Sequence, residues 1–196
     1  MSAVIGWGPV GSPRHDGGVD VEIRDARADD VDALGRVHVR AWQAAYRGVM
    51  PDEYLDGLRA SERTAMWARF LAEPHPDQRL HVVTVDDRVA GFACFGSCPD
   101  AGDAPLGELY AINLDPDQWG RGLGRALLSE VTHELATFGD AAVLWVVPEN
   151  VRARGLYEAA GWADDGGRRH DEEVGVRVDE MRYRTTTRRS GCGSTR

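Results

Sequence analysis

The chain contains no lysine, so every one of its 23 basic residues is an arginine. Positive charge is also in short supply, because 32 acidic residues leave a net charge of -9 and a pI near 5.1. Neither a nucleic acid nor an anionic membrane would be attracted to such a chain, so both are excluded as expected partners. A cationic substrate would be attracted.

Cysteine is scarce as well. Cys94, Cys98 and Cys192 are unevenly placed, which favours reduced thiols, and Cys94 and Cys98 have no second pair with which to form a metal or redox site. The histidines show no ligand spacing either, so no metal is expected.

No apolar run is long enough to cross a bilayer, and residues 1–20 lack the basic start and apolar core of a signal peptide. We therefore expect a cytoplasmic protein. Its 196 residues, 42% of them hydrophobic, suffice for one domain over residues 20–185. The glycine- and proline-rich residues 1–19 and the patternless residues 186–196 are expected to be a disordered leader and tail.

Hydrophobic periodicity and turn residues predict alternating strands and helices. A hairpin connection is expected at Asp86, Asp87 and Arg88, and a loop from Gly166 to Glu173. The expected strands are 21–24, 80–85, 89–95, 109–114, 142–147, 162–165 and 176–184, and the expected helices are 31–45, 52–55, 61–71, the segment ending at Gly139, and the segment from Asn150 to Gly161. This order predicts a mixed sheet whose parallel pair is formed by residues 109–114 and 142–147.

The chain is organised around the segment in which the strand 109–114 is followed by Gly120, Gly122 and Gly124 and then by a helix. A helix that begins on glycines presents unpaired amide N–H groups at its positive end, with no Cβ to keep a ligand away. This pattern predicts an anion site, most simply one for phosphate.

Two other phosphate sites fit less well. A P-loop requires Gly-Lys-Ser/Thr, whereas Arg125 and Ala126 follow the last glycine. A dinucleotide site requires Gly-x-Gly-x-x-Gly, which neither register supplies, although Glu149 at the end of the next strand could serve as a ribose-binding acid. The dinucleotide reading stays open as a weak alternative.

The glycine segment closely resembles the coenzyme A loop of the GNAT superfamily of N-acetyltransferases, Arg/Gln-x-x-Gly-x-Gly/Ala. Here the loop reads from Trp119 to Gly124, with Trp119 in the Arg/Gln position. A second segment resembles the family's Asn-x-x-Ala-x-x-Phe/Leu-Tyr-x-x-x-Gly-Phe signature: Asn150, Ala153, Tyr157, Gly161 and Trp162.

The resemblance covers roughly residues 21–184. It implies an α/β (α+β) fold with a mixed, mostly antiparallel sheet, a central splayed parallel strand pair and flanking helices. It also implies that acetyl-CoA is the co-substrate and that its pantetheine arm enters the gap in the sheet. Acetyl-CoA should then stabilise the fold against heat, because it fills unpaired backbone groups. The coenzyme contacts implied are Ile112, Asn113, Leu114, Trp119, Gly120, Arg121, Gly122, Leu123, Gly124, Arg125, Asn150 and Tyr157.

The reaction implied is transfer of an acetyl group to a primary amine by direct attack in a ternary complex. Tyr157 is the expected acid for the leaving thiolate, and the N–H of Ile112 the expected oxyanion donor. Glu108 is the candidate base, and either burial would have to raise its pKa or it would have to act through water. The alternative is a mechanism without a dedicated base. Trp42 and Tyr46, on the first helix, are expected to line the acceptor pocket.

The alternative function is a non-catalytic acyl-CoA-binding or sensing module on the same fold. The sequence leaves open whether the acceptor is a small-molecule or a peptide amine, and whether the chain is a monomer or a homodimer.

Overall fold

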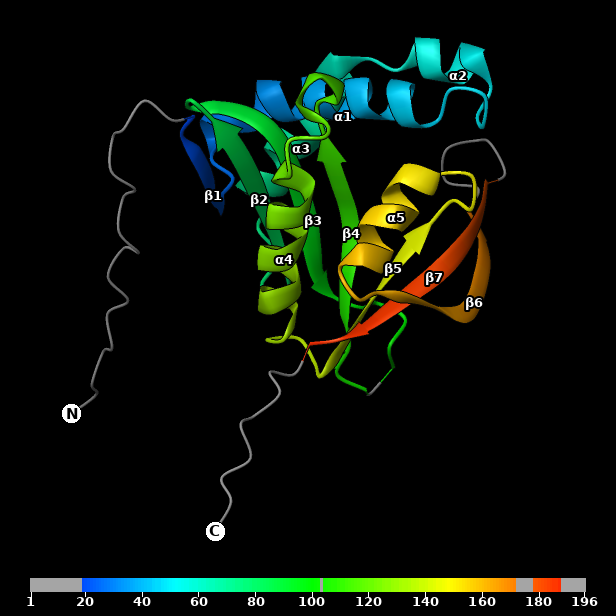
Figure 1. The fold of residues 1–196 in the computed structure, drawn as a ribbon. Coiled ribbons are helices and arrows are strands. Elements are labelled where there is room, and N and C mark those ends of the chain that lie inside the picture. Colours follow the sequence, from blue (N-terminus) through cyan, green and yellow to red (C-terminus); the bar gives the residue numbers. More distant parts are fainter. Residues whose placement is uncertain (1–18, 103, 172–177, 188–196) are drawn as a thin grey trace, which may run out of the picture.

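The computed structural model describes residues 19–102, 104–171 and 178–187. They form a seven-stranded sheet in the order β1-β2-β3-β4-β5-β7-β6, with helices on both faces (Figure 1). The strands are β1 (Val21–Asp25), β2 (Gln78–Val85), β3 (Arg88–Ser97), β4 (Gly107–Leu114), β5 (Ala141–Val146), β6 (Ala163–Asp171) and β7 (Val178–Thr186), and the helices are α1 (Val31–Ala45), α2 (Asp52–Gly57), α3 (Ala60–Ala72), α4 (Leu123–Leu135) and α5 (Val151–Ala159), with short 3₁₀ turns η1 (Ala28–Asp30) and η2 (Pro116–Gln118).

All neighbouring strands are antiparallel except β4 and β5, which confirms the predicted fold class. The hairpin between β2 and β3 is also as predicted. Asp86 and Asp87 both have positive φ, 48° and 62°, as a two-residue turn matching the twist of the strands requires.

The helices bury one side each against the sheet. Helix α4 places Leu127, Leu128, Val131 and Leu135 at 0% exposure against the sheet, the periodicity read from the sequence. Helices α1 and α3 cover the opposite face, where Leu34 and Trp67 pack against Phe92. The sheet thus separates two hydrophobic cores, one under α4 and one under α1 and α3, and a gap between strands connects the two faces.

Several boundary predictions were wrong, and two of the errors have a clear physical reason. Helix α4 ends at Leu135 rather than at Gly139, and Gly139 is not in the left-handed region. A Cβ there would lie 2.2 Å from the carbonyl oxygen of Pro105, so close approach of two chain segments explains this glycine.

The second error concerns β6, which continues to Asp171 where a loop was expected from Gly166. The register shifts between Asp164 and Arg168, and an edge strand of charged residues with such a bulge lacks the apolar alternation that predicts a strand. Strand β7 (Val178–Thr186) ends two residues beyond the predicted end at 184, while the predicted start at 176 lies outside the described residues. The predicted leader 1–19 and tail 186–196 lie almost entirely outside the described residues.

Within the described residues, no helix is long and apolar enough to cross a membrane.

Candidate functional site

The parallel strands β4 and β5 separate partway along their length. They are paired only at Gly107 with Ala142, Glu108 with Val143, and Leu109 with Leu144. Beyond Leu109, β4 continues to Leu114 paired to β3 alone, and β5 continues to Val146 paired to β7 alone. The facing edges of both strands therefore have no strand partner among the described residues, and such an edge can bind an extended ligand.

The glycine turn lies at the open end of this gap. Gly120 and Gly122 have φ of 77° and 82°, a backbone conformation that side chains other than glycine rarely adopt. Gly122 is the N-cap of α4, and no side chain caps that helix end. The first amide N–H groups of α4 thus remain available for an anion, as the sequence predicts.

A cavity of about 750 Å³ extends from the glycine turn through the gap to the end of α1. Its walls come from elements on both sides of the sheet. A ligand bound at the glycine turn could therefore reach through the gap to a second ligand beside α1. The lining residues are Ala41, Trp42, Ala45, Tyr46, Met50, Leu109 to Leu114, Gln118 to Gly120, Gly122 to Arg125, Trp145 to Val147, Asn150, Arg152, Ala153, Leu156, Tyr157, Arg169, Val178 and Glu180.

The structure therefore brings together most of the predicted site residues, from α1, β4, the glycine turn and α5. Arg121 and Glu108 are outside the lining. Arg121 donates instead to the side chain of Gln118.

Glu108 lies at the closed end of the gap, 7% exposed. Burial raises the pKa of its carboxyl, while interactions with the Cys98 thiol and Arg169 oppose that rise. The raised pKa meets one requirement for a base, but the carboxylate does not reach the cavity wall.

Tyr157 is on α5 and faces the gap, 7% exposed. Burial, followed by repulsion from the Tyr46 phenol when that group is ionised, raises the pKa of the Tyr157 phenol, which stays protonated. Asn150 accepts from the N–H of Ala153 at 3.1 Å, which confirms it as the N-cap of α5. Asn150 and Tyr46 both line the cavity, from the start of α5 and the end of α1.

Trp119 occupies the position at which the coenzyme A loop motif has Arg or Gln. Its indole Nε1 donates to the carbonyl oxygen of Leu114 at 3.1 Å. The guanidinium of Arg152, from the first turn of α5, lies 4.5 Å from its ring centroid. Trp119 therefore connects the end of β4 with α5 across the mouth of the cavity.

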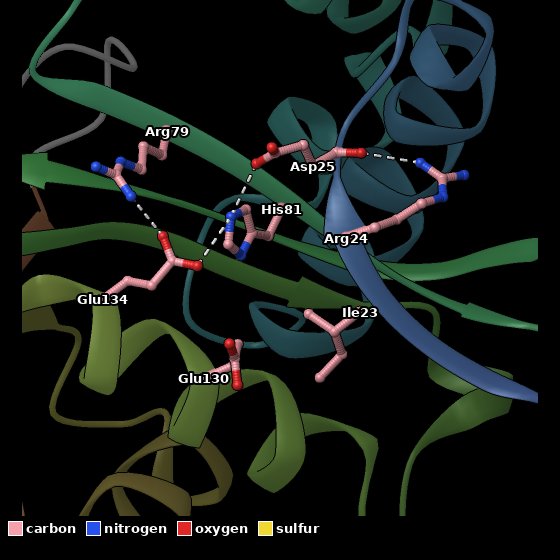
Figure 2. Close-up of a pocket in the computed structure, with 7 residues that line it drawn as sticks. All are labelled: Ile23, Arg24, Asp25, Arg79, His81, Glu130 and Glu134. Atoms are coloured by element: carbon pink, nitrogen blue, oxygen red, sulfur yellow. Dashed lines mark hydrogen bonds and ion pairs between the residues drawn. The ribbon is translucent and has the colours of Figure 1, made fainter. Parts of the chain in front are cut away.

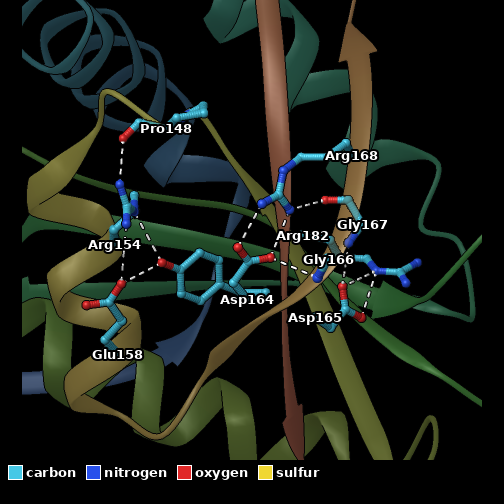
Figure 3. Close-up of polar contacts among 10 residues, drawn as sticks. Pro148, Arg154, Glu158, Asp164, Asp165, Gly166, Gly167, Arg168 and Arg182 are labelled. Carbon is cyan, nitrogen blue, oxygen red and sulfur yellow. Dashed lines mark hydrogen bonds and ion pairs between the residues drawn. The ribbon is translucent and has the colours of Figure 1, made fainter.

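Helix α5 is held against β7 by a polar network (Figure 3). Arg154 donates to the carbonyl of Pro148 at 3.0 Å and to the hydroxyl of Tyr183 at 3.2 Å, and that hydroxyl donates to Glu158 at 2.6 Å. These bonds fix the helix on one side of the gap, and with it the position of Tyr157.

The sequence analysis missed several lining residues, among them Trp145, Arg152, Arg169 and Glu180. A signal for Glu180 was present in the alternation of β7. Met181 and Tyr183 are buried on the α4 face, so the residues between and beside them face the other way. Arg169 lies opposite Glu180 in the β6–β7 register, but a predicted loop hid this pairing.

A second cavity, of about 610 Å³, lies between β1, β2 and α4 and contains none of the predicted site residues. Figure 2 shows His81 between the carboxylates of Asp25 and Glu134, with Nε2 to oxygen distances of 3.0 and 3.5 Å. Arg79 also pairs with Glu134, at 2.7 Å. These contacts tie β1 and β2 to α4. The described residues contain no cluster of three or more groups arranged to hold a metal ion.

Comparison with known proteins agrees with this geometry. The model of the acetyltransferase (GNAT) family matches residues 39–162. An uncharacterised N-acetyltransferase of Bacillus subtilis, YuaI, is 32% identical over 134 residues, which cover 66% of this chain and 73% of that protein.

A mycothiol acetyltransferase of Kocuria rhizophila is 46% identical over 78 residues, or 39% of this chain. The matched segment spans only 26% of that relative's length. Among solved structures, the PaiA N-acetyltransferase of Thermoplasma acidophilum, in complex with coenzyme A, superposes with a TM-score of 0.67 at 20% identity over 83% of this chain and 98% of that one. At this identity the likeness shows the fold.

Proposed function

Because this chain belongs to the acetyltransferase (GNAT) family, we propose that it is an N-acetyltransferase that moves an acetyl group from acetyl-CoA to a primary amine. The observation that carries the proposal is the partly unpaired β4–β5 gap, which opens at the glycine turn and leads along one cavity to Tyr157. A gap of this kind leaves backbone donors and acceptors for a ligand that pairs like a strand.

Acetyl-CoA fits the two ends of this cavity. Its pyrophosphate would be bound by the amides at the start of α4, assisted by Arg125 and Arg152 on the cavity wall. The pantetheine arm would lie along residues 112–114 of β4. Since Trp119 already donates to the Leu114 carbonyl, the arm is expected to use the remaining main-chain groups, with the Ile112 N–H facing the thioester oxygen.

In the reaction, the amine nitrogen attacks the thioester carbon, the C–N bond forms and the C–S bond breaks. The leaving thiolate takes a proton from the Tyr157 hydroxyl. Burial raises the phenol pKa, but the thiolate forms in the same desolvated place, so its basicity rises with it. The transfer is therefore less unfavourable than the raised phenol pKa alone indicates.

The ammonium must lose a proton before it attacks. Glu108 is buried and has a raised pKa but lies off the cavity wall, so we propose that the proton passes to it through water. Direct transfer from an ammonium of pKa ~10.4 to an ordinary carboxylate of ~4.3 would be uphill by about 8 kcal/mol.

The test is release of free thiol from acetyl-CoA by wild type and by Tyr157→Phe across a panel of amines. We expect Tyr157→Phe to lower kcat by about 100-fold, the low end for general acid catalysis, with the Kd for coenzyme A within about twofold. The matched control is Tyr54→Phe. Tyr54 belongs to α2 and does not line the cavity, so kcat should not change.

Full turnover in Tyr157→Phe would remove the acid role. Coenzyme A binding without thiol release from any amine would favour the non-catalytic acyl-CoA-binding module.

A further inference from the structure

The acceptor end of the cavity lies on the face of the sheet covered by α1. Met181 and Tyr183 belong to the core on the α4 side, so Glu180 points to the opposite side, together with Arg169 directly across from it in the register. Both line the cavity beside Trp145, facing Trp42 and Tyr46 of α1. This wall therefore carries one positive and one negative side chain.

Arg169 is held in a defined orientation. Its Nε donates to Oε2 of Glu180 at 2.6 Å, and its guanidinium carbon lies 4.4 Å from the centroid of the Trp145 ring. The two terminal Nη groups have no partner among the described residues. The Trp145 ring and the ion pair with Glu180 fix this guanidinium, and its two terminal Nη groups remain available. Such a group is suited to bidentate binding of a carboxylate.

Only one of the two carboxylate oxygens of Glu180 has a partner in the described part of the chain. Its side chain is 15% exposed, and Oε2 binds Arg169, while Oε1 has no partner within the described part of the chain. A carboxylate with one oxygen available in a secluded site favours an ammonium group. The available cation and the available anion thus lie next to each other on one wall.

We propose that the acceptor is a zwitterion, with its primary amine a few bonds from its own carboxylate, as in a free amino acid: Arg169 binds the carboxylate and Glu180 the ammonium. This inference rests on the proposed function. It disfavours polyamines, aminoglycosides and protein N-termini, none of which carries a carboxylate beside the reacting amine.

The chemistry also favours release of the product. The ammonium loses one proton through water to Glu108, and its nitrogen then bonds to the acetyl carbon as the C–S bond breaks. The thiolate takes the Tyr157 proton, and the second proton that the nitrogen loses as the amide forms returns to the Tyr157 phenolate. The product is an N-acetyl amino acid, which keeps its carboxylate but has no ammonium. Its contact with Glu180 is lost, so the product binds more weakly than the substrate.

The experiment measures thiol release from acetyl-CoA with matched acceptors: amino acids, their methyl esters and the amines left after decarboxylation. For the preferred amino acid, wild type should show a kcat/KM at least about tenfold above its ester and its decarboxylated amine, as loss of a charge-assisted contact predicts. Arg169→Gln should remove this preference, lowering kcat/KM for the amino acid about 10- to 100-fold and that for the decarboxylated amine less than about threefold.

Arg168→Gln is the matched control. Arg168 is the preceding residue on β6, but it faces the other way and pairs with Asp164 at 2.8 Å (Figure 3), so the preference should persist. An unchanged Kd for coenzyme A shows that each variant is folded.

Equal acetylation of amino acids and decarboxylated amines by wild type would overturn the zwitterion assignment without need of any variant. It would leave the proposed function standing, because acetyl-CoA would still be consumed. A preference that survives Arg169→Gln would also overturn it. If acetyl-CoA neither raises the melting temperature nor yields thiol with any acceptor, the proposed function fails and the assignment fails with it.

Discussion

Trp119 is the residue that departs most from the motif it occupies. A flexible polar side chain at this position would reach toward the ligand, whereas the indole bonds to the Leu114 carbonyl and stacks with Arg152. We infer that Trp119 acts on coenzyme binding through Arg152, whose guanidinium it positions at the cavity mouth.

Two substitutions separate the ring of Trp119 from its N–H group. Trp119→Phe keeps an aromatic face for Arg152, so the Kd for coenzyme A measured by titration calorimetry should stay within about threefold of wild type. Trp119→Ala removes the stack and should weaken binding about tenfold, since a cation–π contact is worth about 1 kcal/mol. Equal affinities in the two variants would show that the ring does not position Arg152.

The start of α4 is the element on which the proposed phosphate binding depends. Gly122 has φ of 82° and no atom within 4 Å of the place where a Cβ would stand, so conformation, not space, requires glycine. Gly124 differs, since its φ is not positive and a Cβ there would make ordinary contacts with side-chain carbons of Leu114 and Leu156, at 3.4 and 3.5 Å. Of the two, only Gly122 is required by the conformation of the turn.

Gly122→Ala should therefore weaken coenzyme A binding by about tenfold, because a left-handed alanine costs roughly 1–2 kcal/mol and shifts the first amides of α4. Gly161→Ala is the control. Gly161 also has positive φ, 85°, with open space around it, but it ends the α5 region away from the cavity. Both variants should lose similar stability in urea, and only Gly122→Ala should lose affinity. Equal loss of affinity in the two would contradict a local role for the turn.

At the scale of the whole molecule, stability depends on a buried histidine. His38 packs among Trp42, Trp67 and Phe92 with both ring nitrogens lacking a partner in the described residues. Burial, followed by the charge of Arg63, lowers the pKa of His38 from 6.5 to about 3. Below pH 6.5 the unfolded chain therefore binds a proton that the folded chain does not accept.

From this difference, His38 should lower the free energy of unfolding by about 1.4 kcal/mol for each unit that pH falls from about 6.5 to about 3. His38→Leu should flatten that part of the curve, measured by urea unfolding from pH 4 to 7. His133→Leu, which replaces an exposed histidine of α4, should keep the wild-type slope. Parallel curves for His38→Leu and wild type would contradict the assignment.

Much of the fold, and the local geometry of the proposed coenzyme half of the site, could be predicted from local patterns. The glycine turn, the Asn150 cap and the apolar face of α4 each follow from neighbouring residues. The acceptor half could not, because Arg169 and Glu180 meet only through the pairing of two strands, one of which has a bulge and no apolar alternation. Glu108 shows the same limit: its place on β4 was predicted, but its distance from the cavity depends on where the strands part.

In the described part of the chain, the sheet consists of two halves, β1 to β4 and β5 with β7 and β6, and three residue pairs in the strand register join these halves. The β4–β5 boundary therefore has the fewest paired residues of any strand boundary in the sheet. Most of the β4 edge that faces β5 forms no strand pairing with it. A pantetheine arm bound in the gap would link the two halves of the sheet. Backbone amide exchange along the facing edges of β4 and β5 should therefore slow together when acetyl-CoA binds.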